Sequence, residues 1–390
     1  MKKGAQVTEG KAKIIVIPGD EYVYKGTRVF RAPVFYNPAS KPNRDFLVVL
    51  LGAYVDLVRS GIAFCDPLAG SGVRGIRVAK EVEGVRRVVL SDKNPRSYEQ
   101  ILLNVKLNGL EKIVEVYNED ANALLYKFGG EKLDVVDIDP FGSPAPFLLS
   151  ALVAAKREGM LCATATDMQV LCGLKPEACY RKYGSRIVKT EYCHELAVRV
   201  LIYSAVKLGG IVEKSFRPIF VHSTDHYVRI YGLVDKGAGK VDRLLRNIGY
   251  ILHCKSCMNR KIIPEPADEL CDNCGGKMVK IGPLWLGPLY DDAFVSKALE
   301  KAEKLDYLDK EVTKALDRIS REARGPPTYY DLSCVAKRLK KSCPPISRVV
   351  EELRSMGFFA SRTHFKDYAV RTDASISDVE RAFLAALHDS

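Results

Sequence analysis

Aspartates follow each of the five apolar segments that the sequence predicts as β-strands. The expected strands are residues 62–65, 87–91, 113–117, 133–138 and 160–166, and the acids are Asp66, Asp92, Asp120, Asp139 and Asp167. In open parallel sheets, ligands bind beyond the carboxyl ends of the strands. One aspartate in such a place can simply cap a helix, but five in succession predict an acidic edge that binds a ligand.

A glycine turn after the first strand narrows the choice of ligand. Gly70 and Gly72 belong to a G-x-G-x-x-G pattern, and Asp92 follows about 20 residues later, which also fits a dinucleotide such as NAD. Asp66 argues against NAD, because a carboxylate ahead of the glycines would repel a pyrophosphate but attract the ammonium group of a methionine moiety. S-adenosylmethionine is therefore favoured, with its ribose on Asp92 and its adenine beside Asp120. The expected donor-binding residues are Asp66, Gly70, Gly72, Asp92, Asp120 and Ala121.

The segment Asp139-Pro140-Phe141, after the fourth expected strand, predicts the reaction, because it is similar to the acidic-Pro-Pro-aromatic signature of amino-group methyltransferases. The amine of a nucleobase is a poor nucleophile, so methyl transfer requires its nitrogen to be held in line with the sulfonium methyl. The Asp139 carboxylate and the Pro140 carbonyl can accept the two N–H groups, and the carboxylate can take the released proton. Phe141 can stack on the base. A tight turn with a buried phenylalanine is the alternative.

Two C-x-x-C pairs predict a structural zinc site. The pairs are separated by 13 residues and consist of Cys254, Cys257, Cys271 and Cys274. Four thiolates complete a tetrahedral zinc site and leave no coordination position for catalysis. The chain has eleven cysteines in all, and this odd number, without an export signal, argues against a disulfide scaffold.

The elements that carry these motifs predict an α/β fold. Strands alternate with helices up to about residue 237, which is typical of a doubly wound, Rossmann-like class I methyltransferase sheet. Residues 216–234 are expected to add an antiparallel pair of strands, and one long charged helix is expected over residues 292–322. We expect three domains: a methyltransferase domain of residues 1–237 with an N-terminal extension of residues 1–50, a zinc-ribbon segment of residues 238–285, and a smaller, winged-helix-like α/β domain of residues 286–390.

The charge of the chain favours a polyanionic partner. The 390 residues include 60 Lys and Arg against 48 Asp and Glu, for a net charge of +12, and a basic surface binds phosphates with release of counterions. A nucleic acid is therefore the expected partner, and no protein partner is implied. Apolar runs stay below the roughly 18 residues that a membrane span needs, and no secretory signal is visible, so we expect no membrane contact and a cytoplasmic protein.

Three further groups of residues could take part in chemistry or bind phosphate. Cys193 and His194, on an expected helix, are a conceivable nucleophilic pair, but neighbouring helical residues point about 100° apart, so a structural role is favoured. His222 and His226 flank a turn without a third ligand nearby, which argues against a metal site. Residues 337–341 and 362–365 are basic with an adjacent aromatic residue, and either a solvated surface or phosphate contact explains them.

These motifs together resemble one known family, the tRNA guanine-26 dimethyltransferases of archaea and eukaryotes. The likeness spans nearly the whole chain in family order: EGKAK (9–13), VFYNP (34–38), NRD (43–45), DPFGSP (139–144), TATD (164–167), CHE (193–195), GPLW (282–285) and RTHF (362–365). The resemblance implies S-adenosylmethionine as the methyl donor and tRNA as the substrate. We expect the tRNA to dock on the basic C-terminal domain, residues 286–390, and on the zinc ribbon. Some members of the family also carry a zinc site with four cysteines.

The resemblance further implies roles for individual residues. It places the target guanine between Phe35 and Phe141, makes Asp139 the catalytic carboxylate, and adds Arg44 to the donor-binding residues Asp66, Asp92 and Asp120. The expected reaction is methylation of the 2-amino group of a guanine, at position 26, giving mono- and dimethylguanosine.

Departures from the family pattern leave part of this expectation open. Near the rim of the expected pocket, they occur at Ala39-Ser40, Ala69-Gly70, Met168-Gln169-Val170 and Ile187-Val188-Lys189. They leave open how many methyl groups are added and at which tRNA position. The alternatives are an adenine amino-methyltransferase acting on RNA or DNA, a non-enzymatic RNA-binding zinc protein, and an NAD enzyme.

Overall fold

The chain folds into two compact units, each made of several stretches of sequence. The computed structural model describes residues 4–17, 20–24, 27–31, 33–58, 61–130, 132–224 and 226–388. The first unit consists of Met1–Pro140, Pro146–Ala163 and Ser296–Lys314, and the second of Phe141–Ala145, Thr164–Val295 and Ala315–Ser390. The three domains expected from the sequence are consecutive segments, and their boundaries near residues 237 and 285 stay a prediction.

A parallel sheet forms the centre of the first unit. Its strands lie in the order β9, β8, β5, β6, β7 and pair in parallel. They are β5 (Ile62–Asp66), β6 (Val85–Ser91), β7 (Val114–Tyr117), β8 (Leu133–Ile138) and β9 (Ala155–Ala165). β5 and β8 are almost completely buried, as expected of central parallel strands with apolar residues on both faces. The Rossmann-like sheet expected from the sequence is therefore confirmed.

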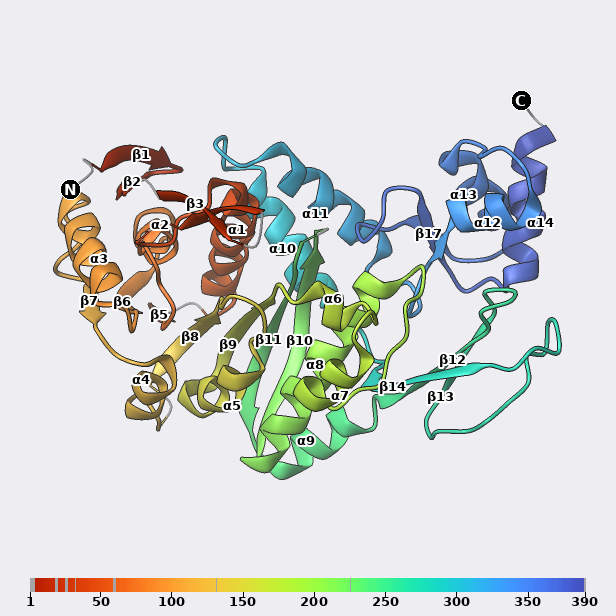
Figure 1. Ribbon diagram of the computed structural model, residues 1–390, viewed down its shortest axis with the longest axis horizontal. Helices are drawn as coiled ribbons and strands as arrows, with labels where there is room; N and C mark the ends of the chain where they lie inside the picture. Colours follow the sequence, from red (N-terminus) through yellow and green to blue (C-terminus); the bar gives the residue numbers. More distant parts are fainter. Residues whose placement is uncertain are drawn as a thin grey trace. The chain divides into compact units, whose positions relative to one another are not determined.

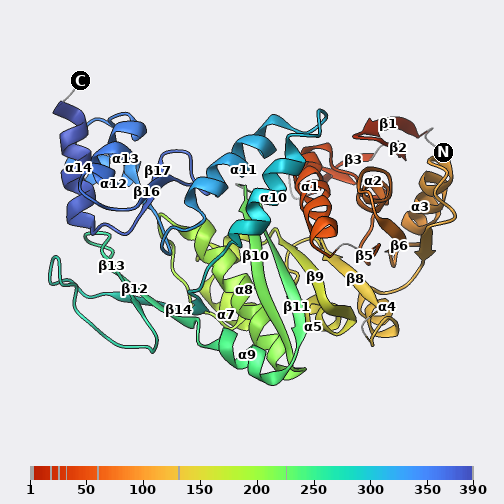
Figure 2. The ribbon, with the colours of Figure 1, turned by 180° about the vertical axis from the view of Figure 1, so that it is seen from behind.

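Helices cover both faces of this sheet. α1 (Lys41–Val58), α2 (Val73–Glu81) and α3 (Pro95–Leu107) lie on one side, and α4 (Ala121–Lys127) and α5 (Ala145–Ala154) lie on the other (Figures 1 and 2). Two antiparallel pairs and a short 3-10 turn precede α1: β1 (Ala5–Glu9) with β2 (Ala12–Val16), β3 (Asp20–Tyr24) with β4 (Thr27–Arg31), and the turn Pro38–Ser40.

The second unit carries its own strands around one long helix. β10 (Lys214–Ser223) pairs antiparallel with β11 (Val228–Lys236), as expected, and α8 (Cys193–Ile211) packs against β10. A small antiparallel sheet in the order β13, β12, β14 carries the cysteine pairs in its loops. The remaining bounds are α6 (Met168–Leu171), α7 (Pro176–Tyr183), α9 (Ala238–Leu245), β12 (Ile248–His253), β13 (Arg260–Ile263) and β14 (Val279–Trp285).

The C-terminal part of the second unit combines helices with a late antiparallel pair of strands, and the winged-helix-like fold expected from the sequence stays a prediction. α12, α13 and α14 enclose a small apolar core that includes Leu332, Val349 and Phe383. A short sheet in the order β15, β17, β16 lies beside them. The bounds are β15 (Tyr330–Asp331), α12 (Leu332–Leu339), α13 (Ile346–Ser355), β16 (Ala360–Arg362), β17 (Ala369–Thr372) and α14 (Ile376–His388).

The prediction of a single charged helix over residues 292–322 was wrong, because two helices occupy this stretch. α10 (Asp292–Ala302) ends well before α11 (Lys310–Glu322) begins. The intervening turn is held by α1: the Asp309 amide donates to Asp45 Oδ2 (2.8 Å) and Lys41 Nζ donates to the Tyr307 carbonyl (3.0 Å). Asp309 then accepts the Glu311 amide (2.9 Å) and starts α11. Within the described residues, no helix is both long and apolar enough to cross a membrane.

Candidate active site

Strand-end aspartates lie along one edge of the parallel sheet in the first unit. Four of the five expected acids are there, at the ends of β5, β6, β7 and β8: Asp66, Asp92, Asp120 and Asp139. Strands β6 and β7 follow on one side of β5, whereas β8 and β9 lie on its other side, so the strand order reverses between β5 and β8. Open α/β sheets bind ligands at such a switch point. Asp167 lies in the second unit, where its carboxylate accepts hydrogen bonds from Tyr183 Oη (2.8 Å) and Lys182 Nζ (2.9 Å).

The turn between β5 and α2 requires glycine. Gly70 has a φ of +55°, and a Cβ atom at this position would lie 3.1 Å from the Phe35 carbonyl oxygen. The Gly70 amide donates to Asp92 Oδ2 (3.0 Å), which ties the turn to the end of β6. Gly72 ends the turn, also with positive φ, and α2 starts without a side-chain cap. The loop between β5 and α2 is therefore bordered by the uncapped backbone amides at the start of α2 and by the ends of β5 and β6.

Asp66 is a buried carboxyl group at the start of this turn. It is only 2% exposed, and its Oδ1 accepts the Leu68 amide (3.1 Å). Burial and the neighbouring Asp137 carboxylate raise the pKa of Asp66 to about 8, although the Arg74 guanidinium opposes the shift. Such a group exchanges its proton near neutral pH, so its charge responds to a cation that binds beside it.

Arg74 of α2 is a buried cation that the sequence analysis missed. Its guanidinium contacts the Asp139 carboxylate and lies 3.2 Å from Asp137 Oδ2. It also donates from Nη1 to Asn43 Oδ1 (3.0 Å). Arg74 therefore connects its own helix, α2, with the end of β8 and with α1. The signal that could have found it is arginine at positions 74 and 77 on the buried face of α2.

Asp120 has a structural function at the end of β7. Its Oδ1 accepts the amides of Asn122 (2.9 Å) and Ala123 (3.3 Å) and so caps α4, whose first residue, Ala121, is buried. The helix-cap interpretation is therefore correct for this residue, and the cap employs Oδ1. Asn118 Nδ2 donates to the Asp92 carbonyl (2.8 Å), which holds the ends of β6 and β7 together.

In the Asp139-Pro140-Phe141 segment, the carboxylate of Asp139 and the ring of Phe141 are accessible to solvent. The Asp139 side chain is 27% exposed, Pro140 is half-buried, and Phe141 is 76% exposed. The buried-phenylalanine alternative is therefore wrong for Phe141. In the first unit, Phe35 is 47% exposed and its backbone borders the glycine turn at Gly70. Both aromatic side chains thus offer accessible ring surface for stacking.

Arg44 lies in a buried network of ion pairs. Its guanidinium donates to both Glu9 carboxylate oxygens, each at 2.6 Å, and to the Asn37 carbonyl (3.0 Å). Glu9 also accepts a hydrogen bond from Arg77 Nη1 (3.0 Å). Arg44 therefore fixes β1 and the turn before α1, and the donor-binding role that the resemblance gave it stays a prediction.

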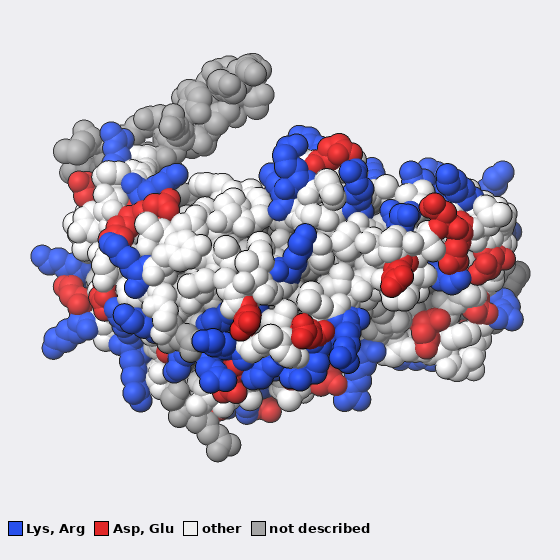
Figure 3. Space-filling view, turned by 90° about the horizontal axis from the view of Figure 1, so that it is seen from below, with Lys and Arg blue, Asp and Glu red and all other residues white. Residues whose placement is uncertain are grey.

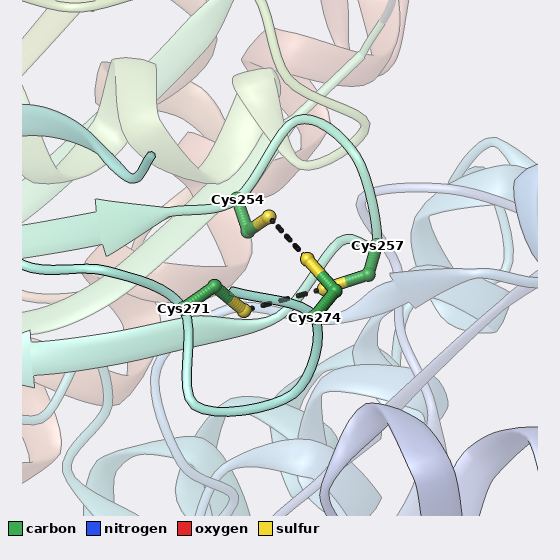
Figure 4. A group of neighbouring side chains, drawn as sticks. All are labelled: Cys254, Cys257, Cys271 and Cys274. Atoms are coloured by element: carbon green, nitrogen blue, oxygen red, sulfur yellow. Dashed lines mark hydrogen bonds between the residues drawn. The ribbon is translucent and has the colours of Figure 1, made fainter. Parts of the chain in front are cut away.

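The four cysteines around β12 and β14 converge on one point (Figure 4). Cys254 Sγ lies 3.5 Å from Cys274 Sγ, and Cys257 Sγ lies 3.4 Å from Cys271 Sγ. Tetrahedral zinc with Zn–S bonds of about 2.3 Å places its sulfur ligands about 3.8 Å apart. The cluster therefore fits the structural zinc site that the sequence predicted.

The two basic segments and His222 have different surroundings in the structure. Three lysines of the first basic segment are exposed around the end of α12: Lys337, Lys340 and Lys341. In the second basic segment, His364 Nδ1 lies 2.6 Å from Glu322 Oε1, and Phe365 stacks on Tyr329, so this segment mainly supports the fold. His222 Nε2 pairs with Tyr231 Oη (3.2 Å).

Comparisons with known proteins give one consistent family. A family model described as N2,N2-dimethylguanosine tRNA methyltransferase matches residues 10–383. A Methanosphaera stadtmanae protein named tRNA (guanine(26)-N(2))-dimethyltransferase is 40% identical over 363 residues, covering 92% of this chain and 93% of that protein. A Saccharolobus solfataricus protein of the same name is 38% identical over 381 residues, covering 96% and 97%.

A solved structure is similar over almost the full length of the chain. The structure of Trm1 from Pyrococcus horikoshii with S-adenosyl-L-methionine has a TM-score of 0.84 and 33% sequence identity. The similarity covers 97% of this chain and 99% of that one. The likeness is therefore one of the fold over nearly the whole chain.

Proposed function

We propose, because this chain belongs to the family of N2,N2-dimethylguanosine tRNA methyltransferases, that it transfers methyl groups from S-adenosylmethionine to a guanine of tRNA. The acceptor is the 2-amino group of guanine 26, and mono- and dimethylguanosine are the products. The observation that carries this proposal is the Asp139-Pro140 segment at the end of β8, beside the glycine turn of β5. NAD chemistry is disfavoured, because buried Asp66 precedes those glycines.

The edge of the sheet supports a donor site built from this chain's own residues. S-adenosylmethionine supplies a methyl group on a positively charged sulfur, together with an ammonium group. Asp66 is suited to the ammonium group and Asp92 to the ribose hydroxyls, while Asp120 and Ala121 border the place for the adenine. Gly70 and Gly72 keep the backbone between them free of side chains. These assignments follow from strand order and charge complementarity.

Asp139 and Pro140 act on the acceptor amine. The carboxylate of Asp139 and the carbonyl of Pro140 accept its two N–H groups, which fixes the nitrogen and directs its lone pair. Asp139 then takes the proton that leaves after transfer. Arg74 contacts the same carboxylate and holds it in position as an anion. Phe141 stacks on the guanine, with Phe35 as its second aromatic surface, once the base has left the RNA stack.

The basic surface supports tRNA binding. Lys and Arg side chains form several groups on the face shown in Figure 3, with Asp and Glu side chains among them. The net charge of +12 favours phosphate contact with counterion release. We assign part of this contact to the C-terminal segment of residues 286–390, where Lys337, Lys340 and Lys341 are exposed. The proposed location is the cytoplasm, where tRNA is processed.

Nucleoside mapping tests the proposed reaction. Unmodified tRNA is incubated with labelled donor and the full chain, then digested, and the methylated nucleosides are identified. We expect N2-methylguanosine and N2,N2-dimethylguanosine, and a tRNA with adenosine at position 26 should remain unlabelled. Labelled methyladenosine would support the adenine amino-methyltransferase instead. Failure to bind donor at all would point to a non-enzymatic RNA-binding protein.

Donor affinity should increase with pH up to slightly above neutrality, because Asp66 must lose its proton to pair with a cation. Burial beside Asp137 raises the pKa of Asp66 to about 8, so the protonated form dominates at lower pH. Between about pH 6 and about pH 7.5, below the pKa of the donor's own α-amino group, the dissociation constant should fall by up to about tenfold per pH unit. Isothermal titration calorimetry in two buffers should also detect proton release on binding.

The matched variant for this experiment is Asp66→Asn. It should bind the donor more weakly at about pH 7.5 and lose the pH slope, because it has no proton to release. A parent dissociation constant that stays flat over this interval, without proton release, would show that Asp66 does not titrate with the donor.

A further inference from the structure

Three side chains that could bind a metal ion meet in the second unit, apart from the four-cysteine cluster and the acidic edge. Cys172, Cys193 and His194 each present one ligand atom, and these atoms all lie within 4.8 Å of one another. From the sequence, structural roles are expected for Cys193 and His194, because the side chains of adjacent helical residues point in different directions. The structure brings them together with Cys172, which is distant in sequence.

The backbone around Cys172 is held in place by close packing. Cys172 is the C-cap that directly follows α6, and the next residue, Gly173, has a φ of +81°. A Cβ atom on Gly173 would lie 2.4 Å from the Val188 carbonyl carbon, so only glycine allows this approach. The turn after α6 is thereby packed against the segment that leads into α8. Cys172 is therefore placed by the fold near the start of α8.

The start of α8 supplies the other two ligands. Cys193 is its first residue and His194 its second, and the whole helix is 19 residues long. The N-terminus of a long helix favours a thiolate over a thiol, because the aligned peptide dipoles are positive there. Thiolate is the form in which cysteine binds a metal. Cys172 is buried, whereas Cys193 and His194 are partly exposed, so an ion can enter from solvent.

We propose that Cys172, Cys193 and His194 form a second zinc site in this chain. Two thiolates and one imidazole are ligands that zinc prefers, and the sulfur spacing of about 3.8 Å in tetrahedral zinc lies within the observed limit. Three protein ligands leave one coordination position, which water takes from the exposed side. This open position distinguishes the site from the closed four-cysteine cluster, and its zinc is released first to a chelator.

The second zinc ion would brace the beginning of α8, where several segments are joined. Glu195, directly after the ligands, is completely buried. It accepts hydrogen bonds from Arg371 Nη2 (2.9 Å) of β17 and from the Thr328 amide (2.8 Å), and Arg199 pairs with it one turn along the helix. Fixing Cys193 and His194 to Cys172 holds Glu195 in the place where these partners converge.

Counting zinc ions per chain tests the proposal without relying on activity. The full chain and its variants are loaded with Zn²⁺, passed through gel filtration, and analysed by elemental mass spectrometry. We expect Cys193→Ser to hold one zinc ion fewer than the parent. His194→Gln, which keeps both thiols, should release its zinc to a mild chelator faster than the parent. The matched control is Cys343→Ser, which removes an exposed cysteine elsewhere in the second unit and should hold as much zinc as the parent.

Two results would overturn the second site. One is equal zinc content in the parent and in Cys193→Ser. The other is a Cys172–Cys193 disulfide in the zinc-loaded parent, seen as a mass deficit of two hydrogens that reduction restores. If Cys193→Ser fails to fold, as judged by circular dichroism, the comparison of His194→Gln with the parent decides: unchanged zinc content and release rate would reject the site.

Discussion

Replacing Asp139 with alanine should slow methyl transfer by about 10³-fold in single-turnover assays, in line with the loss of a general base. The Asp139 carboxylate follows the central strand β8 and is accessible from solvent, so its removal leaves the acceptor amine without a group that orients it and takes its proton. Asp66 and Asp92, which we propose to bind the donor, lie at the ends of the other strands β5 and β6. We therefore expect the dissociation constant of S-adenosylmethionine to change by less than about threefold, about 0.7 kcal/mol.

Two further variants separate this effect from general damage. Asp139→Asn keeps the size of the side chain but cannot take a proton, so it should be almost as slow as the alanine variant. Asp317→Ala removes an exposed acid on α11 that pairs with Arg321 and should retain the parent rate. Asp139→Ala turning over within about tenfold of the parent would remove Asp139 from the mechanism.

The sheet and its acidic edge could be predicted because they depend on local patterns. Each apolar strand is followed by a polar group, and parallel strands bring their carboxyl ends to one edge, so Asp66, Asp92, Asp120 and Asp139 could be placed without coordinates. The four cysteines were equally predictable, because C-x-x-C spacing encodes the loop that places two sulfurs on one metal. In these cases a short segment determines both position and chemistry.

The side-chain partners could not be predicted, because they come from segments far apart in the chain. Arg74 meets Asp139 across 65 residues, and Arg44 meets Glu9 across 35. Neither pair has a spacing rule, and both depend on how α1 and α2 pack on the sheet. The break between α10 and α11 was missed for the same reason, because the turn is fixed by Asp45 and Lys41 of α1. Cys172 and Cys193 likewise meet only after folding.

Replacing Cys271 with serine should disorder the small sheet of β12, β13 and β14, because this sheet is stabilised by zinc binding instead of by a large hydrophobic core. The buried cluster of this sheet has six members, and three of them are the zinc-site cysteines Cys254, Cys257 and Cys271. So small an apolar core does not stabilise a sheet by itself. In zinc-finger peptides, structural zinc binds with an apparent free energy of about 10–16 kcal/mol, and this binding free energy drives folding.

Hydrogen exchange measured by mass spectrometry gives the decisive comparison. In Cys271→Ser, or after zinc is removed by a chelator, amide protection should fall over residues 254–278. The loss should extend to the C-terminal helices, because Arg338 Nη1 donates to the Ser256 carbonyl (3.2 Å) and Ser377 Oγ to Asn273 Oδ1 (2.8 Å). Cys343→Ser should leave this protection intact. Donor affinity should be unchanged in Cys271→Ser, because Asp66 and Asp92, the residues proposed to bind the donor, belong to the other unit. Undiminished protection over residues 254–278 in the metal-free protein would mean that the sheet is stable without zinc, and that the four cysteines contribute little to its folding.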